Sequence, residues 1–361
     1  MKRREFLSYL TALGVTMTFG TIPAHGSSRC IGRKLPLGML IIDAHAHPDQ
    51  LYDLYGNIPD DETSTLEKIN QLGMAVSSFA AVGDFRDGTV VPFNNVMEQL
   101  GSVIGLESEG QVKIVRSISD LSGRLCQSDF IHRAILSLEG AYDVGTTTDE
   151  VSSRLNLLYG SGVRMITLMH HTDNQFGGGM HTAGWNGPGL TDLGRQLVER
   201  MISLGMVIDV AHAHYATVKD IAEIAVAHGV PIIDSHTSLS PNEVPNGKRL
   251  RTWKEMEIIA GTGGLICTWP LKWESETGEY GRWTIRDWAK ENYQMKRRLG
   301  AKHVALGTDG GGLLPYLVDG YESILDLPKL TQAMHKVGFT DREIDGYTGK
   351  NMMKTLKKCI G

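Results

Sequence analysis

The sequence predicts an α/β protein with the (β/α)8 architecture of the TIM barrel, in which eight parallel strands close into a barrel inside a ring of helices. Short apolar runs recur eight times, each too short for a helix and bounded by glycine, proline or polar residues. Longer segments with helical periodicity separate them. Strands that alternate with helices favour a parallel sheet, and eight such units over about 310 residues favour a closed barrel, with an open doubly wound sheet as the alternative.

The expected strands follow the apolar runs along the chain. They are residues 39–42, 76–82, 134–138, 163–168, 206–210, 231–233, 264–268 and 303–306. The clearest expected helices are residues 190–204, 215–227, 252–260, 284–299 and, near the end of the chain, 351–359. Thr191 is placed to cap the first of them. Residues 83–125 are expected to form an elaborated connection.

Residues 1–26 have the features of an export signal rather than of a folded element. Lys2-Arg3-Arg4-Glu5-Phe6-Leu7 resembles the twin-arginine consensus, a mildly apolar stretch follows, and Ala24-His25-Gly26 offers small residues for cleavage. We expect export to the periplasm or cell envelope of a bacterium, with residues 27–361 as a single barrel domain that has extra C-terminal helices. The alternative is an uncleaved N-terminal anchor, although the apolar stretch is short for a membrane span.

Composition excludes several classes of function. The net charge of −5, without a basic patch containing interleaved aromatic residues, gives no reason to expect nucleic acid as a partner. No later segment is apolar enough for a further membrane span. The four cysteines lie far apart and form no Cys-x-x-Cys pair, so a cysteine zinc site is not expected and a disulfide cannot be assigned from the sequence.

The informative feature is what stands at the ends of the apolar runs. In a (β/α)8 barrel the carboxyl ends of all strands converge on one face, and that face carries the active site. We therefore expect residues from runs far apart in the sequence to meet there. The candidates are His45, His47, Glu139, His170, His171, His212, His236 and Asp309.

Within this set, a metal centre is the best interpretation. His45 and His47 are two residues apart at a strand end, so both rings should point to the same face and could chelate a metal such as zinc. Glu139 ends an apolar run, where an unpaired carboxylate would be expensive to bury. Four histidines, with His212 and His236, and one bridging glutamate would suffice for two zinc ions. His214 forms a second His-x-His with His212 but is expected to begin the following helix.

Five ordered segments carry a specific resemblance. They read GVRMITLMH at residues 162–170, GLTDLG at 189–194, GMVIDVAH at 205–212, DSHTS at 234–238 and LGTD at 306–309. In order and approximate spacing they resemble the signatures of the membrane dipeptidase (renal dipeptidase, peptidase M19) family of the amidohydrolase superfamily. The resemblance covers residues from about Leu37 to the C-terminus and is weakest in residues 83–125.

The resemblance implies a role for each candidate. His45 and the residue at position 47 would bind one zinc ion, and Glu139 would bridge to a second ion that His212 and His236 hold. Three further residues would act on the substrate. His170 would contact the carbonyl of the scissile bond, Arg249 would bind the substrate's terminal carboxylate, and Asp309 would shuttle protons. Lys248 and Arg251 are the neighbouring alternatives to Arg249 if the alignment slips.

Two departures from the family pattern bear on function. The family usually has His-x-Asp at the first strand, whereas this chain has His45-x-His47, which raises the charge of the centre by one. That change lowers the pKa expected for a metal-bound water and alters metal preference or occupancy. The family also usually has a second aspartate two residues after the one at position 309, where this chain has Gly311.

The resemblance implies a dipeptidase in which a hydroxide bridging two zinc ions attacks the peptide carbonyl of a small peptide substrate. Two alternatives stay open. One is an amidohydrolase that acts on a lactone, a β-lactam or an N-acyl amino acid. The histidine at position 47, which departs from the family pattern, supports this alternative. The other is a non-catalytic relative that assists maturation of an exported product. A homodimer is also left open.

Overall fold

The computed structural model describes residues 39–47, 61–84, 88–122, 131–275, 278 and 281–360. The expected export signal, Cys30 and Cys126 lie outside these residues.

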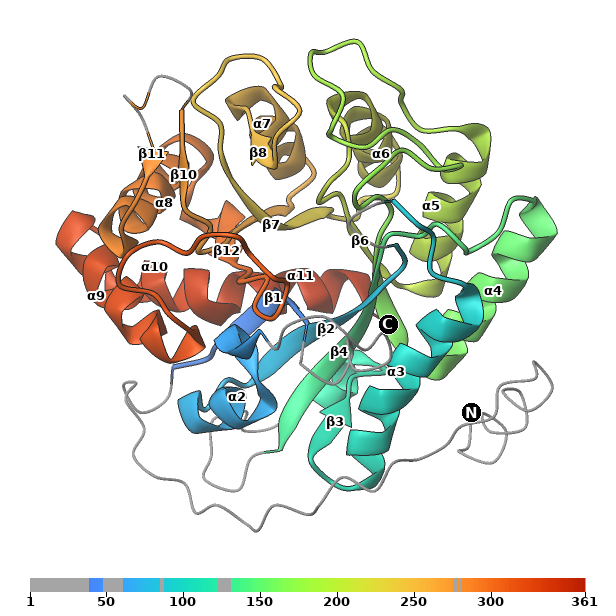
Figure 1. The fold of residues 1–361 in the computed structure, drawn as a ribbon, viewed down its shortest axis with the longest axis horizontal. Helices are drawn as coiled ribbons and strands as arrows, with labels where there is room; N and C mark the ends of the chain where they lie inside the picture. The colour runs from blue at the N-terminus through green and yellow to red at the C-terminus, as the bar shows by residue number, and fades with distance from the viewer. Residues whose placement is uncertain are drawn as a thin grey trace.

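Eight parallel strands form the central sheet (Figure 1), and each overlaps one of the predicted apolar runs. The overlap is a single residue for the first and sixth runs, because those two strands begin where the predicted runs end. In their spatial order they are β1 (Ile42–Ala46), β2 (Val76–Val82), β4 (His132–Glu139), β5 (Val163–Thr167), β6 (Val207–Asp209), β7 (Ile233–Leu239), β9 (Leu265–Thr268) and β12 (Val304–Leu306). Spatial order follows chain order, as in a (β/α)8 barrel. The predicted fold class is therefore confirmed.

The barrel closes between β12 and β1 through residues that follow the short last strand. The Asp309 amide donates to the His45 carbonyl at 3.0 Å, and the His47 amide donates to the Gly310 carbonyl at 2.8 Å. A parallel bridge joins Ala46 to Gly310. These bonds close the ring of strands, which excludes the open doubly wound alternative.

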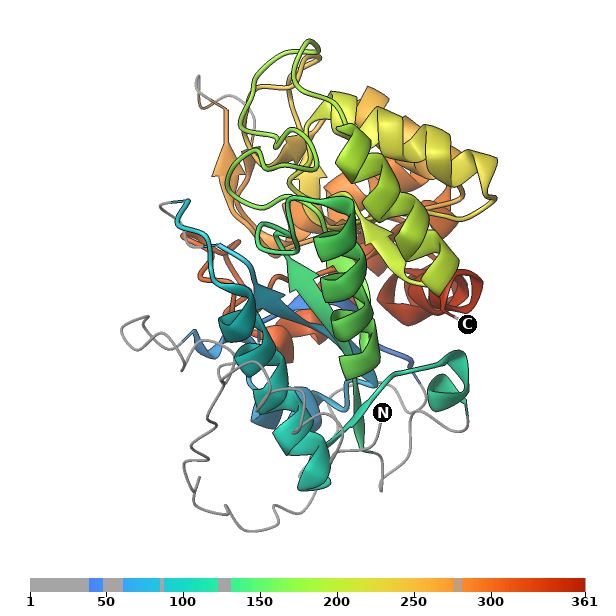
Figure 2. The same cartoon turned by 90° about the vertical axis from the view of Figure 1, so that its right-hand side faces the viewer.

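Helices surround the barrel, as Figures 1 and 2 show. They are α2 (Leu66–Leu72), α3 (Phe93–Ser108), α4 (Thr148–Ser161), α5 (Asp192–Leu204), α6 (Tyr215–Ala227), α7 (Trp253–Gly261), α8 (Ile285–Leu299), α9 (Leu327–Val337), α10 (Asp341–Asp345) and α11 (Asn351–Cys359). The predicted helices are confirmed within two residues at each end. Thr191 caps α5 as predicted, since its side chain accepts from the Gly194 amide. Among the described residues, no helix combines the length and the apolar character that a membrane crossing requires.

The predicted connection at residues 83–125 contains a long helix and an extra strand. After α3, strand β3 (Val112–Ile114) pairs with β4 outside the barrel path, and a 3-10 helix spans Ile118–Leu121. Short strands also follow the later barrel strands: β8 (Leu250–Arg251) pairs with β7, and β10 (Trp273–Glu274) pairs with β11 (Gly281–Arg282). Of the basic residues that the sequence offered for substrate binding, Arg251 lies on β8, and Lys248 and Arg249 directly precede this strand.

Strand β4 shows how the core leaves room for a polar centre. Leu136 and Leu138 pack in the cluster that also holds residues of the surrounding helices, while Ile135 joins the cluster with Met352 and Leu356 of α11. Alternate residues of a strand point to opposite faces. Glu139 therefore shares the face of Ile135, beyond the apolar layer that α11 covers.

Candidate metal centre at the strand ends

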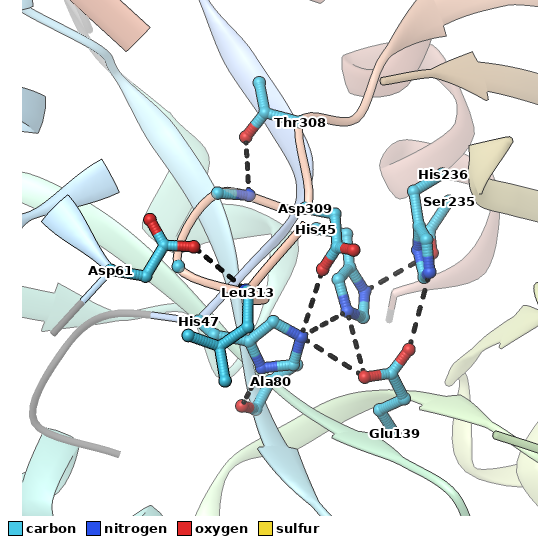
Figure 3. A network of polar contacts seen from close by, with 12 residues as sticks. His45, His47, Asp61, Ala80, Glu139, Ser235, His236, Thr308, Asp309 and Leu313 are labelled. Atoms are coloured by element: carbon cyan, nitrogen blue, oxygen red, sulfur yellow. Dashed lines mark hydrogen bonds and ion pairs between the residues drawn. The ribbon is translucent and has the colours of Figure 1, made fainter. Parts of the chain in front are cut away.

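Polar side chains from six barrel strands meet at the carboxyl ends of the strands. His45 lies on β1 with His47 directly after it, Glu139 ends β4, and His236 lies on β7. His170, His212 and Asp309 each stand three residues after the end of their strand, β5, β6 and β12. All seven side chains are buried. Figure 3 shows five of them, His45, His47, Glu139, His236 and Asp309, pointing toward one another.

Glu139 lies at the middle of this group, with each carboxylate oxygen facing a different pair of histidines. Oε2 is 3.5 Å from His45 Nε2 and 3.2 Å from His47 Nε2. Oε1 is 3.1 Å from His212 Nε2 and 3.5 Å from His236 Nε2. One carboxylate thus connects two pairs of imidazoles, which is the arrangement in which a glutamate can bridge two cations.

The donor atoms of each histidine pair are spaced as ligands of one ion. His45 Nε2 and His47 Nε2 are 3.0 Å apart, and His212 Nε2 and His236 Nε2 are 2.8 Å apart. Two ligands about 2.0–2.1 Å from a zinc ion stand about 3 Å from each other. Imidazole and carboxylate are donors that zinc accepts. The residues present could therefore hold a metal ion.

Hydrogen bonds on the outer side of the rings decide which nitrogen faces the centre. His47 Nδ1 lies 3.0 Å from the Ala80 carbonyl oxygen. Because a carbonyl only accepts, His47 Nδ1 carries a proton, and Nε2 is the nitrogen that faces the centre. The Nδ1 atoms of His45 and His236 both face the hydroxyl of Ser235, at 3.3 and 2.9 Å.

The two halves of the centre differ in their electrostatics. Burial lowers the pKa of His212 and His236 well below the usual value, so both rings are neutral and can bind a metal through a lone pair. Burial acts on His47 in the same direction, but Asp309 and Glu139 outweigh it and raise the pKa of His47 to about 10. Protons and metal ions therefore compete for His47 Nε2. Despite burial, the neighbouring charges of His170 and His45 hold the pKa of Glu139 well below its usual range.

His170 is held by an acidic residue that the sequence analysis missed. Its Nδ1 donates to Asp84 Oδ1 at 2.6 Å, and its Nε2 stands 3.6 Å from Glu139 Oε2. Asp84 is buried and also accepts from the His171 amide. A signal was present, because Asp84 follows the second apolar run just as Asp309 follows the eighth.

Comparison with known proteins identifies the family. The sequence pattern of the membrane dipeptidase family (Peptidase family M19) matches residues 93–359, well over half of the chain. The chain belongs to the membrane dipeptidase family.

Two relatives with similar sequences are named as dipeptidases. The chain is 29% identical to the "Uncharacterized dipeptidase C965.12" of Schizosaccharomyces pombe over 230 residues, which cover 62% of this chain and 52% of that protein. It is 24% identical to the "Dipeptidase verJ" of Clonostachys rogersoniana over 223 residues, covering 62% and 54%. The chain thus matches about half the length of these relatives.

A solved structure shares the fold. The metallo peptidase of Rhodobacter sphaeroides, crystallised with a phosphinate mimic of the dipeptide L-Ala-D-Ala, superposes with a TM-score of 0.74. The match covers 89% of this chain and 99% of that protein at 20% identity. It supports the (β/α)8 fold of this membrane dipeptidase family member.

In this family member the three basic residues at positions 248, 249 and 251 differ in their burial and contacts. Arg251 is fully buried, 2.6 Å from Asp234 and 2.9 Å from Glu255, and it also donates to two backbone carbonyls. It is therefore a structural residue. Lys248 is exposed. Arg249 is half-buried, and its guanidinium lies 5.8 Å from the centre of the Trp269 ring, which packs 5.2 Å from the His236 ring.

Arg249 also acts electrostatically on the centre. After burial, its positive charge is among the causes that lower the pKa of His171, His181, His212 and His236. Among the pKa shifts of these four histidines, Arg249 is the only one of the three basic candidates that is among the causes.

The two departures from the family pattern occur side by side. His47 Nε2 lies 3.3 Å from Asp309 Oδ1, so the added imidazole contacts the strand-eight acid. A Cβ built on Gly311 would collide with the His47 carbonyl oxygen, and Gly311 has a φ of +82°. The chain therefore passes too close to His47 for any side chain at position 311.

Backbone strain is also found at this centre. His212 and Asp309 have positive φ values of 61° and 50°, which are uncommon for residues other than glycine.

His214 begins α6 as predicted: its ring accepts from the Ala216 amide and faces the Gly184 carbonyl. It therefore caps a helix and lies outside the histidine cluster.

Proposed function

We propose that the protein is a metal-dependent hydrolase that cleaves the peptide bond of dipeptides. In this proposal His45, His47 and Glu139 hold one zinc ion, and Glu139, His212 and His236 hold a second. The observation that carries the proposal is the position of Glu139, whose two oxygens each face one histidine pair at 3.1–3.5 Å. Membership of the membrane dipeptidase family supports the choice of reaction.

The chain's own residues supply proton transfer and charge stabilisation. When bound, the two zinc ions would activate a water molecule and polarise the carbonyl of the scissile bond. Asp309 accepts the proton that the attacking water loses and returns it to the amine nitrogen as the carbon–nitrogen bond breaks. His170 Nε2 donates to the developing oxyanion, a contribution of about 3–4 kcal/mol for one such donor. Asp84 holds the ring of His170 through its Nδ1.

Substrate length is set by Arg249. A guanidinium binds a carboxylate through two parallel hydrogen bonds, and Arg249 lies beside Trp269 at the edge of the histidine cluster. A terminal carboxylate held there restricts the substrate to very short peptides. The Rhodobacter sphaeroides structure, which holds a dipeptide mimic on the same fold, agrees with a substrate of this size.

The proposal places the reaction outside the cytoplasm. The Lys2-Arg3-Arg4 sequence resembles a twin-arginine signal, and the proposed mature domain is residues 27–361. A homodimer stays an open prediction.

A second candidate is an amidohydrolase with another substrate, such as a lactone, a β-lactam or an N-acyl amino acid. The observation that favours it is the local change at position 47, where an imidazole contacts Asp309 and replaces the usual carboxylate. A panel of these substrates and dipeptides, tested on zinc-loaded protein, separates the two candidates by the ratio of their kcat/KM values.

The test of the proposed function combines metal analysis with a matched variant. Zinc-loaded protein should contain two ions per chain and hydrolyse dipeptides, and chelation should abolish the activity until zinc is returned. Glu139→Gln should lose activity and metal, whereas Glu67→Gln, an exposed acid on α2, should keep both. Full activity in folded Glu139→Gln would refute the proposed centre.

A further inference from the structure

Ser235 lies behind the histidine cluster and contacts two of its rings. It is fully buried on β7, next to His236 in the sequence. Its Oγ is 2.9 Å from His236 Nδ1 and 3.3 Å from His45 Nδ1. Figure 3 shows these rings side by side, with Ser235 on the side away from Glu139.

The two rings that share this hydroxyl belong to different halves of the centre. His45 is paired with His47 and faces Glu139 Oε2, whereas His236 is paired with His212 and faces Glu139 Oε1. The two ring centres are only 4.2 Å apart. A single side chain therefore contacts one ligand candidate of each proposed zinc ion.

Hydrogen-bonding capacity defines what the hydroxyl does there. A serine oxygen has two lone pairs and can accept from both Nδ1–H groups at once. A ring whose Nδ1 carries the proton has its lone pair on Nε2, which is the atom that faces Glu139 in both residues. The Ser235 amide donates to Asp209 Oδ1 at 3.0 Å, which fixes the backbone and hence the position of the hydroxyl.

The other two rings are oriented differently. His47 Nδ1 is fixed by the Ala80 carbonyl, and His212 Nδ1 has no hydrogen-bond partner among the described residues. Ser235 thus supplies the outer hydrogen bond for two of the four rings. Through these two hydrogen bonds one side chain reaches both halves of the centre from the outer side of the rings.

We propose that Ser235 is a positioning residue that fixes the orientation and tautomer of one histidine in each half of the centre, and so couples the affinities for the two zinc ions. This inference rests on the proposed function. The inference predicts that removal of this one hydroxyl weakens the binding of both ions, although the hydroxyl lies outside both proposed ligand sets.

The experiment compares zinc binding by the full chain and by two serine variants. Both zinc dissociation constants are measured by competition with a chromophoric chelator, and stoichiometry is measured by elemental analysis. Ser235→Ala should weaken both constants, by about 10–100-fold each, as expected for loss of a hydrogen bond to a ligating histidine. Ser78→Ala is the matched control, because this buried serine on β2 bonds only to the Ser137 hydroxyl. It should leave both constants unchanged.

Each result decides a different statement. Failure of the unaltered chain to bind two ions would overturn the proposed function. If Ser235→Ala binds two ions with unchanged affinities, the role of Ser235 is overturned but the proposed function is not. If the affinity for only one ion falls, the coupling between the two sites is overturned. If Ser235→Ala does not fold, the isosteric pair Ser235→Thr and Ser235→Val decides. The threonine variant keeps the hydroxyl and should bind both ions more tightly than the valine variant. Equal affinities in the two variants would contradict the inference.

Discussion

At the scale of single residues, the chemistry depends on which nitrogen of each histidine faces the centre. The Ala80 carbonyl determines this for His47, and the Asp84 carboxylate determines it for His170. Both partners are buried; Ala80 lies on β2 and Asp84 two residues after it, and this strand contributes none of the proposed zinc ligands. The neighbours of the histidines therefore matter as much as the histidines themselves.

Asp84→Asn tests the role of the carboxylate behind His170. An amide at this position can still accept from Nδ1, but it lacks the negative charge of the carboxylate. We expect kcat for dipeptide hydrolysis to fall about 100-fold, the loss typical when one oxyanion donor no longer acts. KM and zinc content should stay the same. Unchanged kcat, or loss of zinc in the folded variant, would show that Asp84 does not act through His170.

Arg249→Met tests selection of the substrate's carboxylate. KM for a dipeptide with a free carboxylate should rise strongly, and preference over the same dipeptide with an amidated C-terminus should disappear, because the bidentate partner is gone. Lys248→Met is the control, since this neighbouring cation is exposed. If Lys248→Met abolishes the preference and Arg249→Met does not, the assignment is wrong by one residue.

Sequence reasoning brought the main candidates together but could not separate neighbours within one segment. Glu139 and the histidines stand out because each follows an apolar run. Asp84 also follows an apolar run, but no candidate was assigned to that run, and only the structure shows that Asp84 contacts His170. Arg249 and Arg251 look alike in the sequence. Only folding brings Asp234 and Glu255 to Arg251 and makes it structural.

At the scale of elements, the barrel strands were predictable because each is a short, continuous apolar run between turn residues. Helix α3 was not, because it lies in a long connection, contains two glycines and begins after a proline with no side-chain cap. Its burial depends on packing against β2 and β3. The closing seam was also beyond prediction, since backbone bonds after β12 make it, and these carry no signal in side-chain pattern.

Strand β4 begins with a buried histidine that makes stability depend on pH. His132 stacks on Phe79, and burial lowers its pKa to about 4. The unfolded chain, with a pKa near 6.5, binds more protons between pH 6.5 and 4, so stability falls as the pH falls through that window. At pH 5 the loss from this residue is about 2 kcal/mol.

Denaturant unfolding at pH 7 and pH 5 measures this loss. His132→Phe should reduce the difference between the two pH values by about that amount, because phenylalanine keeps the stacking and does not titrate. His335→Phe, at an exposed site on α9, is the control and should keep the full difference. An equal pH dependence in His132→Phe and the unaltered chain would assign the effect to other residues.

At the scale of the whole molecule, the proposed zinc ligands tie together strands from all around the barrel. They come from β1, β4, β6 and β7, and the seam between β12 and β1 is formed by backbone groups of His45, His47, Asp309 and Gly310. An ion bound by these side chains would therefore stabilise the ring of strands and its closure. Binding to the folded state alone raises stability by mass action.

Removal of zinc should consequently lower the melting temperature. Free zinc at 100 times its dissociation constant adds about 2.7 kcal/mol for each site, so chelation should lower Tm by about 5 °C or more. Scanning calorimetry with and without chelator measures the shift. Glu139→Gln, which lacks the bridging carboxylate, should show little change on chelation. A shift of the same size in this variant would mean that the stabilising metal binds elsewhere.

The most direct test of the central claim is the anomalous diffraction of zinc-loaded crystals at the zinc absorption edge. We predict two peaks, one on each side of the Glu139 carboxylate. The first should lie about 2.0–2.2 Å from His45, His47 and one glutamate oxygen, and the second at the same distances from His212, His236 and the other oxygen. Peaks that leave Glu139 out, or a fully loaded protein with no peak between these rings, would contradict the account.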